Sequence, residues 1–138
     1  MSWDTYYQRK SVIDRVLSDV TETGADEIPA AWTAEITEVF GGEDEFLFAL
    51  HYGWANTLHA RLDPVLESPP EDTAGTVRRI WDALAAERPA TISLLARYAG
   101  RPALKGAMER LQGQLAWAPG VDVWQLTENC AGPARIAA

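Results

Sequence analysis

The chain has 138 residues, of which 47% are hydrophobic and 23% are charged, and this composition is typical of one globular domain rather than of a disordered segment. Its formal net charge of −8 and its isoelectric point near 4.7 disfavour non-specific binding to nucleic acid or to anionic lipid. No apolar run approaches the roughly 20 residues of a membrane-spanning helix, and the N-terminus lacks the basic and apolar regions of a signal peptide. A single cysteine, Cys130, excludes an internal disulfide and a cysteine-based zinc site, so we expect a cytoplasmic protein that does not enter a membrane.

The first predicted element is a helix that begins close to the N-terminus and ends at Gly24. Ser2 is suited to cap its start, and Gly24 is suited to end it because glycine readily adopts the left-handed backbone conformation. Apolar residues recur at three- and four-residue steps and share one helical face, which carries Trp3, Tyr6, Tyr7, Ile13, Val16, Leu17 and Val20. A short second helix is predicted to begin at Pro29 and to end at Gly41 and Gly42. The side chains that this second helix is expected to bury are Trp32, Ile36, Val39 and Phe40.

A long third helix is predicted from residue 43 to about residue 67. Its first residues are Glu43, Asp44 and Glu45, acids that the positive end of the helix macrodipole favours at this place. One apolar face carries Leu47, Leu50, Trp54, Leu58 and Val65, and another carries Phe48, Tyr52, Ala55, Leu62 and Leu66. A helix that is apolar on two sides is expected at the centre of a fold, either between other helices or between the core and a dimer partner. Pro64 is expected to bend this helix near its end.

Helix breakers divide the next part of the chain into three further helices. A loop at residues 68–71 precedes a fourth helix that ends before Pro89, a fifth that ends at Gly100 and a sixth that begins at Pro102. Their apolar faces carry Val77, Ile80, Trp81 and Leu84, then Ile92, Leu95, Tyr98 and Ala99, then Leu104, Met108, Leu111 and Leu115.

The end of the chain adds little regular structure. After a turn at Pro119 and Gly120, residues 121–126 predict one more short helix, and residues 131–138 predict a flexible tail. No segment alternates with a period of two for long enough to be a strand. The predicted fold class is therefore all-α, a single-domain bundle of six or seven helices.

One segment has the appearance of a junction between two helices of a known family. Residues 39–47 read Val-Phe-Gly-Gly-Glu-Asp-Glu-Phe-Leu, in which an apolar pair and a small-residue turn precede the charged start of a long apolar helix. This segment resembles the junction between the recognition helix and the fourth helix of the TetR family of transcriptional regulators. Residues 84–95 and 102–104 also resemble the ligand-binding half of that family. Over residues 10 to about 115, the chain resembles a shortened and divergent TetR-family protein.

The resemblance implies an organisation and a set of partners. Residues 1–42 would hold degenerate helix-turn-helix-like helices, and residues 43–130 would form a ligand-binding and dimerisation bundle, all within one compact domain. The protein would be a homodimer formed by helices of its C-terminal half. Its ligand would be a small apolar or aromatic molecule.

The departures from the family fall in the part that would contact DNA. Residues 12–40 are too few for the family's first three helices, so one helix of the helix-turn-helix is expected to be missing or collapsed. The family usually opens its fourth helix with a lysine that meets phosphate, and this chain has Glu43 there. The segment that matches the recognition helix, residues 31–39, contains Glu35 and Glu38 and no base.

Charge is also distributed unevenly along the chain. Residues 1–45 hold eleven acids and three bases, whereas residues 46–138 hold nine of each. Lysine and arginine side chains that neutralise phosphate supply most of the affinity of such proteins for DNA. We therefore expect DNA reading to be lost and DNA not to be a partner.

Few residues have the types and spacings that chemistry requires. The two histidines, His51 and His59, lie about 12 Å apart along one helix, too far to bind one metal ion, so we expect neither a metal site nor a cofactor. His51 is the first choice for a catalytic base, because it lies one turn before Trp54 and because the pKa of histidine suits proton transfer near neutral pH. Glu35 would be its acid. The plainer interpretations are a buried, hydrogen-bonded histidine and a solvated acidic face. No nucleophile elbow, catalytic triad or phosphate-binding glycine loop occurs, so the sequence favours a non-enzymatic function.

Aromatic residues suggest a pocket, and acidic residues suggest a docking patch. The chain has six tryptophans and four tyrosines, most of them on predicted inward faces, where core packing is the plainer interpretation. Those expected to line a ligand cavity are Tyr52, Trp54, Trp81, Tyr98 and Trp117. Glu43, Asp44 and Glu45 are either a favourable helix start or a docking patch for a basic protein.

Three functions remain open at this point. The first is a TetR-like helical protein that no longer reads DNA and acts as a small-molecule-binding or protein-interaction module. The second is a small cofactor-free enzyme of a biosynthetic pathway that uses His51 in an aromatic pocket. The third is a genuine TetR-type transcriptional regulator.

Overall fold

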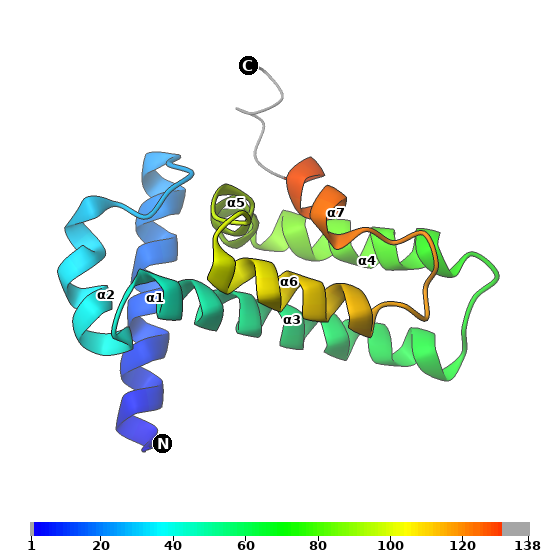
Figure 1. The fold of residues 1–138 in the computed structure, drawn as a ribbon, viewed down its shortest axis with the longest axis horizontal. Coiled ribbons are helices and arrows are strands. Elements are labelled where there is room, and N and C mark those ends of the chain that lie inside the picture. Colours follow the sequence, from blue (N-terminus) through cyan, green and yellow to red (C-terminus); the bar gives the residue numbers. More distant parts are fainter. Residues whose placement is uncertain (1, 131–138) are drawn as a thin grey trace.

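The computed structural model describes residues 2–130, and within that range the chain folds into seven α-helices and one short 3-10 helix (Figure 1). In chain order these are α1 (Trp3–Thr23), η1 (Ala30–Trp32), α2 (Thr33–Phe40), α3 (Glu43–Glu67), α4 (Thr73–Glu87), α5 (Pro89–Arg97), α6 (Pro102–Gln114) and α7 (Val123–Asn129). No strand occurs among the described residues, so the predicted all-α class is confirmed. The predicted tail at residues 131–138 lies outside the described residues.

Local sequence signals set the ends of the first helices. The Ser2 hydroxyl accepts a hydrogen bond of 3.2 Å from a backbone N–H in the first turn of α1. Gly24 ends α1 with a φ of +70°, and Gly41 ends α2 with a φ of +94°, both in the left-handed region that favours glycine. The second helix differs from the prediction at its start, because Pro29 precedes the 3-10 turn η1 and the α-helix itself begins at Thr33.

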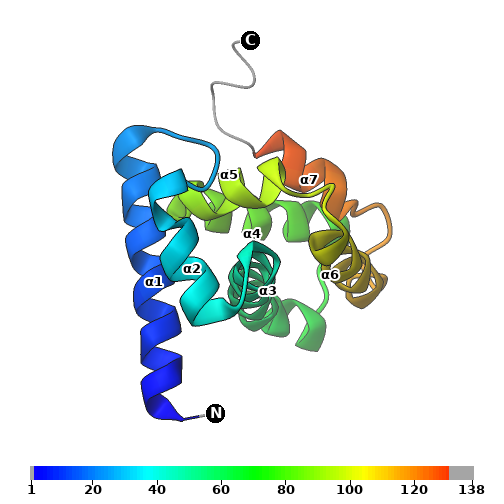
Figure 2. The same cartoon turned by 60° about the vertical axis from the view of Figure 1, so that its left-hand side comes forward.

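The helix α3 packs against α2, α4, α5 and α6, and Figure 2 shows it end-on among the other helices. It continues through Pro64 to its last residue, Glu67. Its buried side chains are Phe46, Leu47, Leu50, His51, Trp54, Leu58 and Leu62. The expected burial on two sides is only partly correct, because Phe48, Tyr52 and Leu66 of the second apolar face are exposed to solvent.

The N-terminal part of α1 extends beyond the other helices (Figures 1 and 2). The buried side chains of α1 are Val12, Val16 and Val20. The aromatic residues that precede them were expected on the same inward face, but they are open to solvent: Trp3 is 74% exposed, Tyr6 49% and Tyr7 60%. The periodicity identified a shared face, but the aromatic residues at its N-terminal end are not covered by another described helix.

Candidate functional site

The aromatic residues predicted to line one ligand cavity lie in separate places. Trp54 of α3 and Trp81 of α4 form an edge-to-face pair in the core, with ring centroids 5.3 Å apart. Neither indole N–H has a hydrogen-bond partner among the described residues, so both rings act through packing. Tyr52 is exposed on another side of α3, and Trp117 packs half-buried against the core after α6. The structure therefore does not bring these four rings to one cavity.

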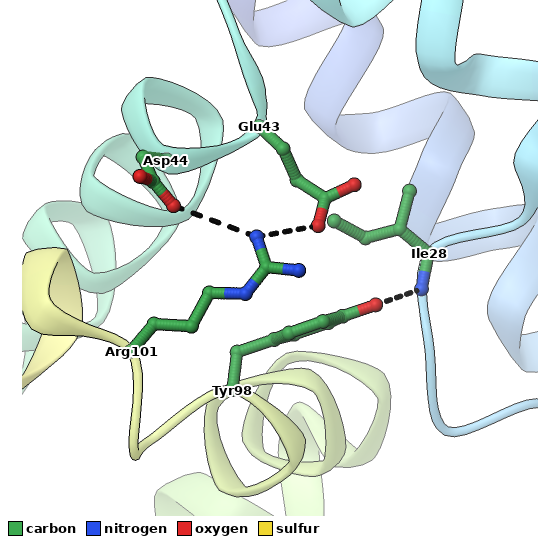
Figure 3. Close-up of polar contacts among 5 residues, drawn as sticks. All are labelled: Ile28, Glu43, Asp44, Tyr98 and Arg101. Atoms are coloured by element: carbon green, nitrogen blue, oxygen red, sulfur yellow. Dashed lines mark hydrogen bonds and ion pairs between the residues drawn. The ribbon is translucent and has the colours of Figure 1, made fainter.

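Tyr98, the fifth of these residues, lies at the end of α5 and joins segments that are distant in sequence (Figure 3). Its hydroxyl accepts a hydrogen bond of 2.9 Å from the Ile28 N–H, and burial raises the pKa of the phenol. The guanidinium of Arg101 lies 4.7 Å from the centre of the Tyr98 ring. The same guanidinium contacts the carboxylates of Glu43 at 2.6 Å and Asp44 at 3.4 Å. The cluster therefore ties the start of α3 and the loop before η1 to the junction of α5 and α6.

The predicted docking patch at the start of α3 is partly occupied from within the chain. Arg101 forms ion pairs with Glu43 and Asp44. The carboxylate of Glu45 lies close to Gly42, so a Cβ added to Gly42 would lie 2.8 Å from an oxygen of that carboxylate. A basic partner would have to compete with Arg101 for two of the three carboxylates.

The residues predicted as a catalytic pair face different neighbours. Glu35 of α2 forms an ion pair with Arg15 of α1 at 2.5 Å. His51 of α3 is only 6% exposed and lines a groove between α3 and α6. Glu35 is not part of the lining of that groove. The structure therefore does not bring Glu35 to His51.

The groove between α3 and α6, called the α3–α6 groove below, has a volume of about 120 Å³. Its lining is formed by Phe48, His51, Tyr52, Ala55, Asn56 and His59 of α3 and by Ala107, Arg110, Leu111 and Gln114 of α6. His59 and Gln114 share a hydrogen bond of 3.0 Å that links the two helices. The lining contains no carboxylate, and Arg110 is its one permanently charged residue, although the chain as a whole has a net charge of −8. The lining of the groove therefore carries one positive charge on a protein of negative net charge.

His51 supplies a neutral polar group to this groove. Burial lowers the pKa of His51 to about 4, and the positive charge of Arg110 lowers it further in the same direction. The ring is therefore neutral at physiological pH. Its nitrogens form no hydrogen bond with another described residue, and they are not closed off from the groove. The neutral ring can accept a hydrogen bond through one nitrogen and donate one through the other, on the same groove lining as the Arg110 guanidinium.

A second hollow, called the α1 cleft below, lies between α1, α3 and the junction of α4 and α5 and has a volume of about 450 Å³. Its α1 wall consists of Lys10, Ile13, Asp14, Leu17, Ser18 and Thr21. Its other walls consist of Ala49, Leu50, Gly53 and Trp54 of α3, followed by Glu87, Arg88, Pro89, Ala90 and Thr91. Lys10 and Asp14 form an ion pair at 2.9 Å, so the charges of the α1 wall compensate each other.

Sequence reasoning missed the contribution of α6 to the α3–α6 groove. The positions of Ala107, Arg110, Leu111 and Gln114 follow helical spacing, so a shared face of α6 was readable from the sequence. The sequence does not show which helix this face of α6 packs against, because residues 107–114 lie far along the chain from His51. Arg110 and Asn56 were therefore not identified beforehand.

Comparison with known proteins adds no relative to this description. No protein-family model matches the chain, and neither a characterised protein nor a solved structure was found to be similar to it. Within residues 2–130, no three His, Cys, Asp or Glu side chains gather as a metal ion would require. No helix in that range has both the length and the apolar character needed to cross a membrane. The function therefore has to be inferred from the geometry of the chain itself.

Proposed function

We propose that this chain is a small-ligand-binding module of TetR-like organisation that does not read DNA, and that its ligand is a small aromatic carboxylate bound in the α3–α6 groove. One observation carries the proposal: Arg110 and the buried ring of His51 line the same groove, and no carboxylate belongs to that lining. An anion placed there gains a charged partner and meets no like charge from the groove itself.

The composition of the groove supports this ligand class. Arg110 is suited to a carboxylate because the guanidinium can donate two parallel hydrogen bonds, and Asn56 adds a further donor. Phe48 and Tyr52 offer aromatic surface on the same lining. A volume of about 120 Å³ is smaller than the roughly 300–1,000 Å³ of pockets for drug-sized molecules, which limits the ligand to a single ring.

The engagement of the N-terminal bases supports the loss of DNA reading. Residues 1–45 hold three bases, and Lys10 and Arg15 are ion-paired with Asp14 and Glu35. The third, Arg9, lies over an aromatic ring of α2, 5.4 Å from its centre. Each of these bases would have to leave an internal contact to neutralise a phosphate.

The catalytic alternative draws less support from the geometry. A pKa of about 4 makes His51 a weak base near neutral pH, where a general base works best with a pKa close to the ambient pH. Its expected acid, Glu35, is paired with Arg15.

The first experiment titrates the full chain with benzoate and, separately, with its neutral analogue benzamide, followed by NMR and calorimetry. Benzoate should bind saturably and shift the signals of the α3–α6 groove. It should also raise the pKa of His51, because the anion offsets the repulsion from Arg110. Arg110→Gln should weaken benzoate binding by about tenfold or more, the value of a charge-assisted hydrogen bond. Arg78→Gln, which removes an exposed arginine of α4, should leave binding unchanged.

Three results would contradict the ligand assignment: no saturable effect of benzoate, an equal response to benzamide, or undiminished binding in Arg110→Gln. The DNA part of the proposal has its own test. Retention of the chain on immobilised genomic DNA at physiological salt, lost as salt is raised, would refute the absence of DNA reading.

A further inference from the structure

Three aromatic side chains form an exposed cluster on the free end of α1. Trp3 lies 6.1 Å from Tyr6 and 6.1 Å from Tyr7, and the two tyrosine rings lie 5.4 Å apart. All three are at least 49% exposed. Large aromatic side chains that pack on one another in solvent are typical of an interaction surface.

The same side of α1 continues from this aromatic cluster into the α1 cleft. Positions 3, 7, 10, 14, 17 and 21 follow alternating steps of four and three residues, which place them in one line along a helix. The first two belong to the aromatic cluster. The last four, Lys10, Asp14, Leu17 and Thr21, belong to the wall of the α1 cleft. One face of α1 therefore carries the aromatic cluster at its N-terminal end and forms a wall of the α1 cleft towards its C-terminal end.

The residues of this face are arranged symmetrically about position 12. Trp3 and Thr21 lie at equal distances from that position, as do Tyr7 and Leu17, and as do Lys10 and Asp14. When two copies of such a helix pack antiparallel, each residue meets its counterpart in the other copy. Lys10 of each copy then faces Asp14 of the other, and the aromatic cluster of each copy faces the α1 cleft of the other.

We propose that this face of α1 is an interface between two copies of the chain, which pack antiparallel about a two-fold axis near residue 12, with the aromatic cluster of each copy in the α1 cleft of the other. An interface of this kind uses the same patch on both copies. A parallel arrangement would set Lys10 against Lys10 and Asp14 against Asp14 and would leave both clefts empty, so charge and shape favour the antiparallel one.

The surface available is sufficient for a specific dimer. A fully covered aromatic side chain buries about 150–250 Å², and these three expose between 49% and 74% of their surface. Together with the area of the clefts that cover them, the two clusters would bury on the order of the 1,000 Å² that a specific interface needs. Gly53 forms part of the cleft wall, and a Cβ added to it would meet no atom within 4 Å, which leaves room for an incoming ring.

This interface is independent of the ligand site proposed above. The α3 residues of the α1 cleft are Ala49, Leu50, Gly53 and Trp54, and none of them belongs to the lining of the α3–α6 groove. Dimerisation would therefore leave that groove open, and the failure of either proposal would leave the other standing. The interface also differs from the C-terminal one that the family resemblance predicts.

The first test measures the mass of the full chain by sedimentation equilibrium over a range of concentrations. The wild-type chain should form a dimer. The double variant Trp3→Ala with Tyr7→Ala should weaken self-association by more than about tenfold, since both rings are buried at the interface. Leu66→Ala, which truncates an exposed apolar residue of α3 outside the interface, should associate as the wild type does. Circular dichroism should show that all three chains are folded, because the altered side chains are exposed.

A second test exchanges the charges at positions 10 and 14 to determine how the two α1 helices are aligned. Lys10→Glu and Asp14→Lys should each dimerise poorly alone, since each sets like charges against each other across the axis. Mixed together they should form a one-to-one heterodimer, and the double variant should recover the wild-type dimer. A wild-type chain that stays monomeric at hundreds of micromolar would overturn the proposal. So would undiminished association without the aromatic cluster, or a mixture of the two charge variants that fails to associate.

Discussion

Lowering the pH from 7 to 4 is expected to destabilise the chain through the buried ring of His51. Its pKa is about 4 in the folded chain, against an ordinary value of 6.5. Between these two values the unfolded chain binds a proton at His51 that the folded chain excludes, so the free energy of unfolding falls as the pH falls. Above about pH 6.5 the ring is neutral in both states, and below about pH 4 it is charged in both, so the loss is confined to this window.

The size of the effect follows from the difference between the two pKa values. A separation from 6.5 to about 4 corresponds to about 3 kcal/mol of unfolding free energy, lost over the whole window. The side chain is only 6% exposed, so solvent screening reduces this value little. A loss of this size is a large fraction of the stability of a small domain, typically about 5–15 kcal/mol.

Urea unfolding followed by circular dichroism, repeated at several pH values between 7 and 4, measures the loss. The wild-type chain should lose about 3 kcal/mol more than His51→Gln across this range, because glutamine cannot titrate. Carboxylates titrate in both chains and cancel in the comparison. Parallel pH dependences in the wild type and His51→Gln, or an NMR titration of the His51 ring with its midpoint near 6.5, would refute the reasoning.

Further predictions concern the burial and the contacts of single side chains. Tyr98→Phe removes the acceptor of the Ile28 N–H and should lower the free energy of unfolding in urea by about 1–2 kcal/mol; an unchanged midpoint would show that water replaces the hydroxyl. Trp54→Ala should cost about 3–5 kcal/mol in that assay, because it empties a core position. At concentrations at which the chain is monomeric, Trp3→Ala should change stability by less than about 0.5 kcal/mol, because its ring is exposed in the single chain, and similar losses in both variants would contradict the assigned burial. Partial burial raises the pKa of Cys130 to about 11, so iodoacetamide should modify its thiol slowly at neutral pH in the folded chain and faster in urea, and equal rates would count against a raised pKa in the folded chain.

The helix boundaries were readable from the sequence because their signals are local. Ser2 and Gly24 bound α1 as expected, since the capping residue and the helix end that it caps are neighbours in the chain. Pro89 and Pro102 open α5 and α6, where a missing N–H carries no penalty. Such signals act within a few residues, so they remain valid whatever surrounds the helix.

The faces that meet between helices were not readable in the same way. The hydrogen bond from the Ile28 N–H to Tyr98 spans 70 residues of sequence, and no local pattern announces it. Periodicity also placed Trp3 on one face with Val16, yet only Val16 is buried by another helix of the chain. A period identifies which residues share a face, but it does not say whether a helix, a second copy or water lies opposite.

The uneven distribution of charge along the sequence becomes more even in the fold. Arg97 and Arg101, from the second half of the chain, pair with Glu27 at 3.2 Å and Glu43 at 2.6 Å. Exposed pairs of this kind contribute at most about 1 kcal/mol to stability, so their main effect is on the local potential. These arginines compensate part of the excess negative charge of the N-terminal residues. The electrostatic attraction of this region for a basic protein is therefore weaker than the count of acidic residues suggests. The α3–α6 groove differs, because its lining holds Arg110 and no acid that could compensate it. Arg110 is therefore the one formal charge on that lining, and for this reason we propose an anionic ligand for the groove rather than a basic partner.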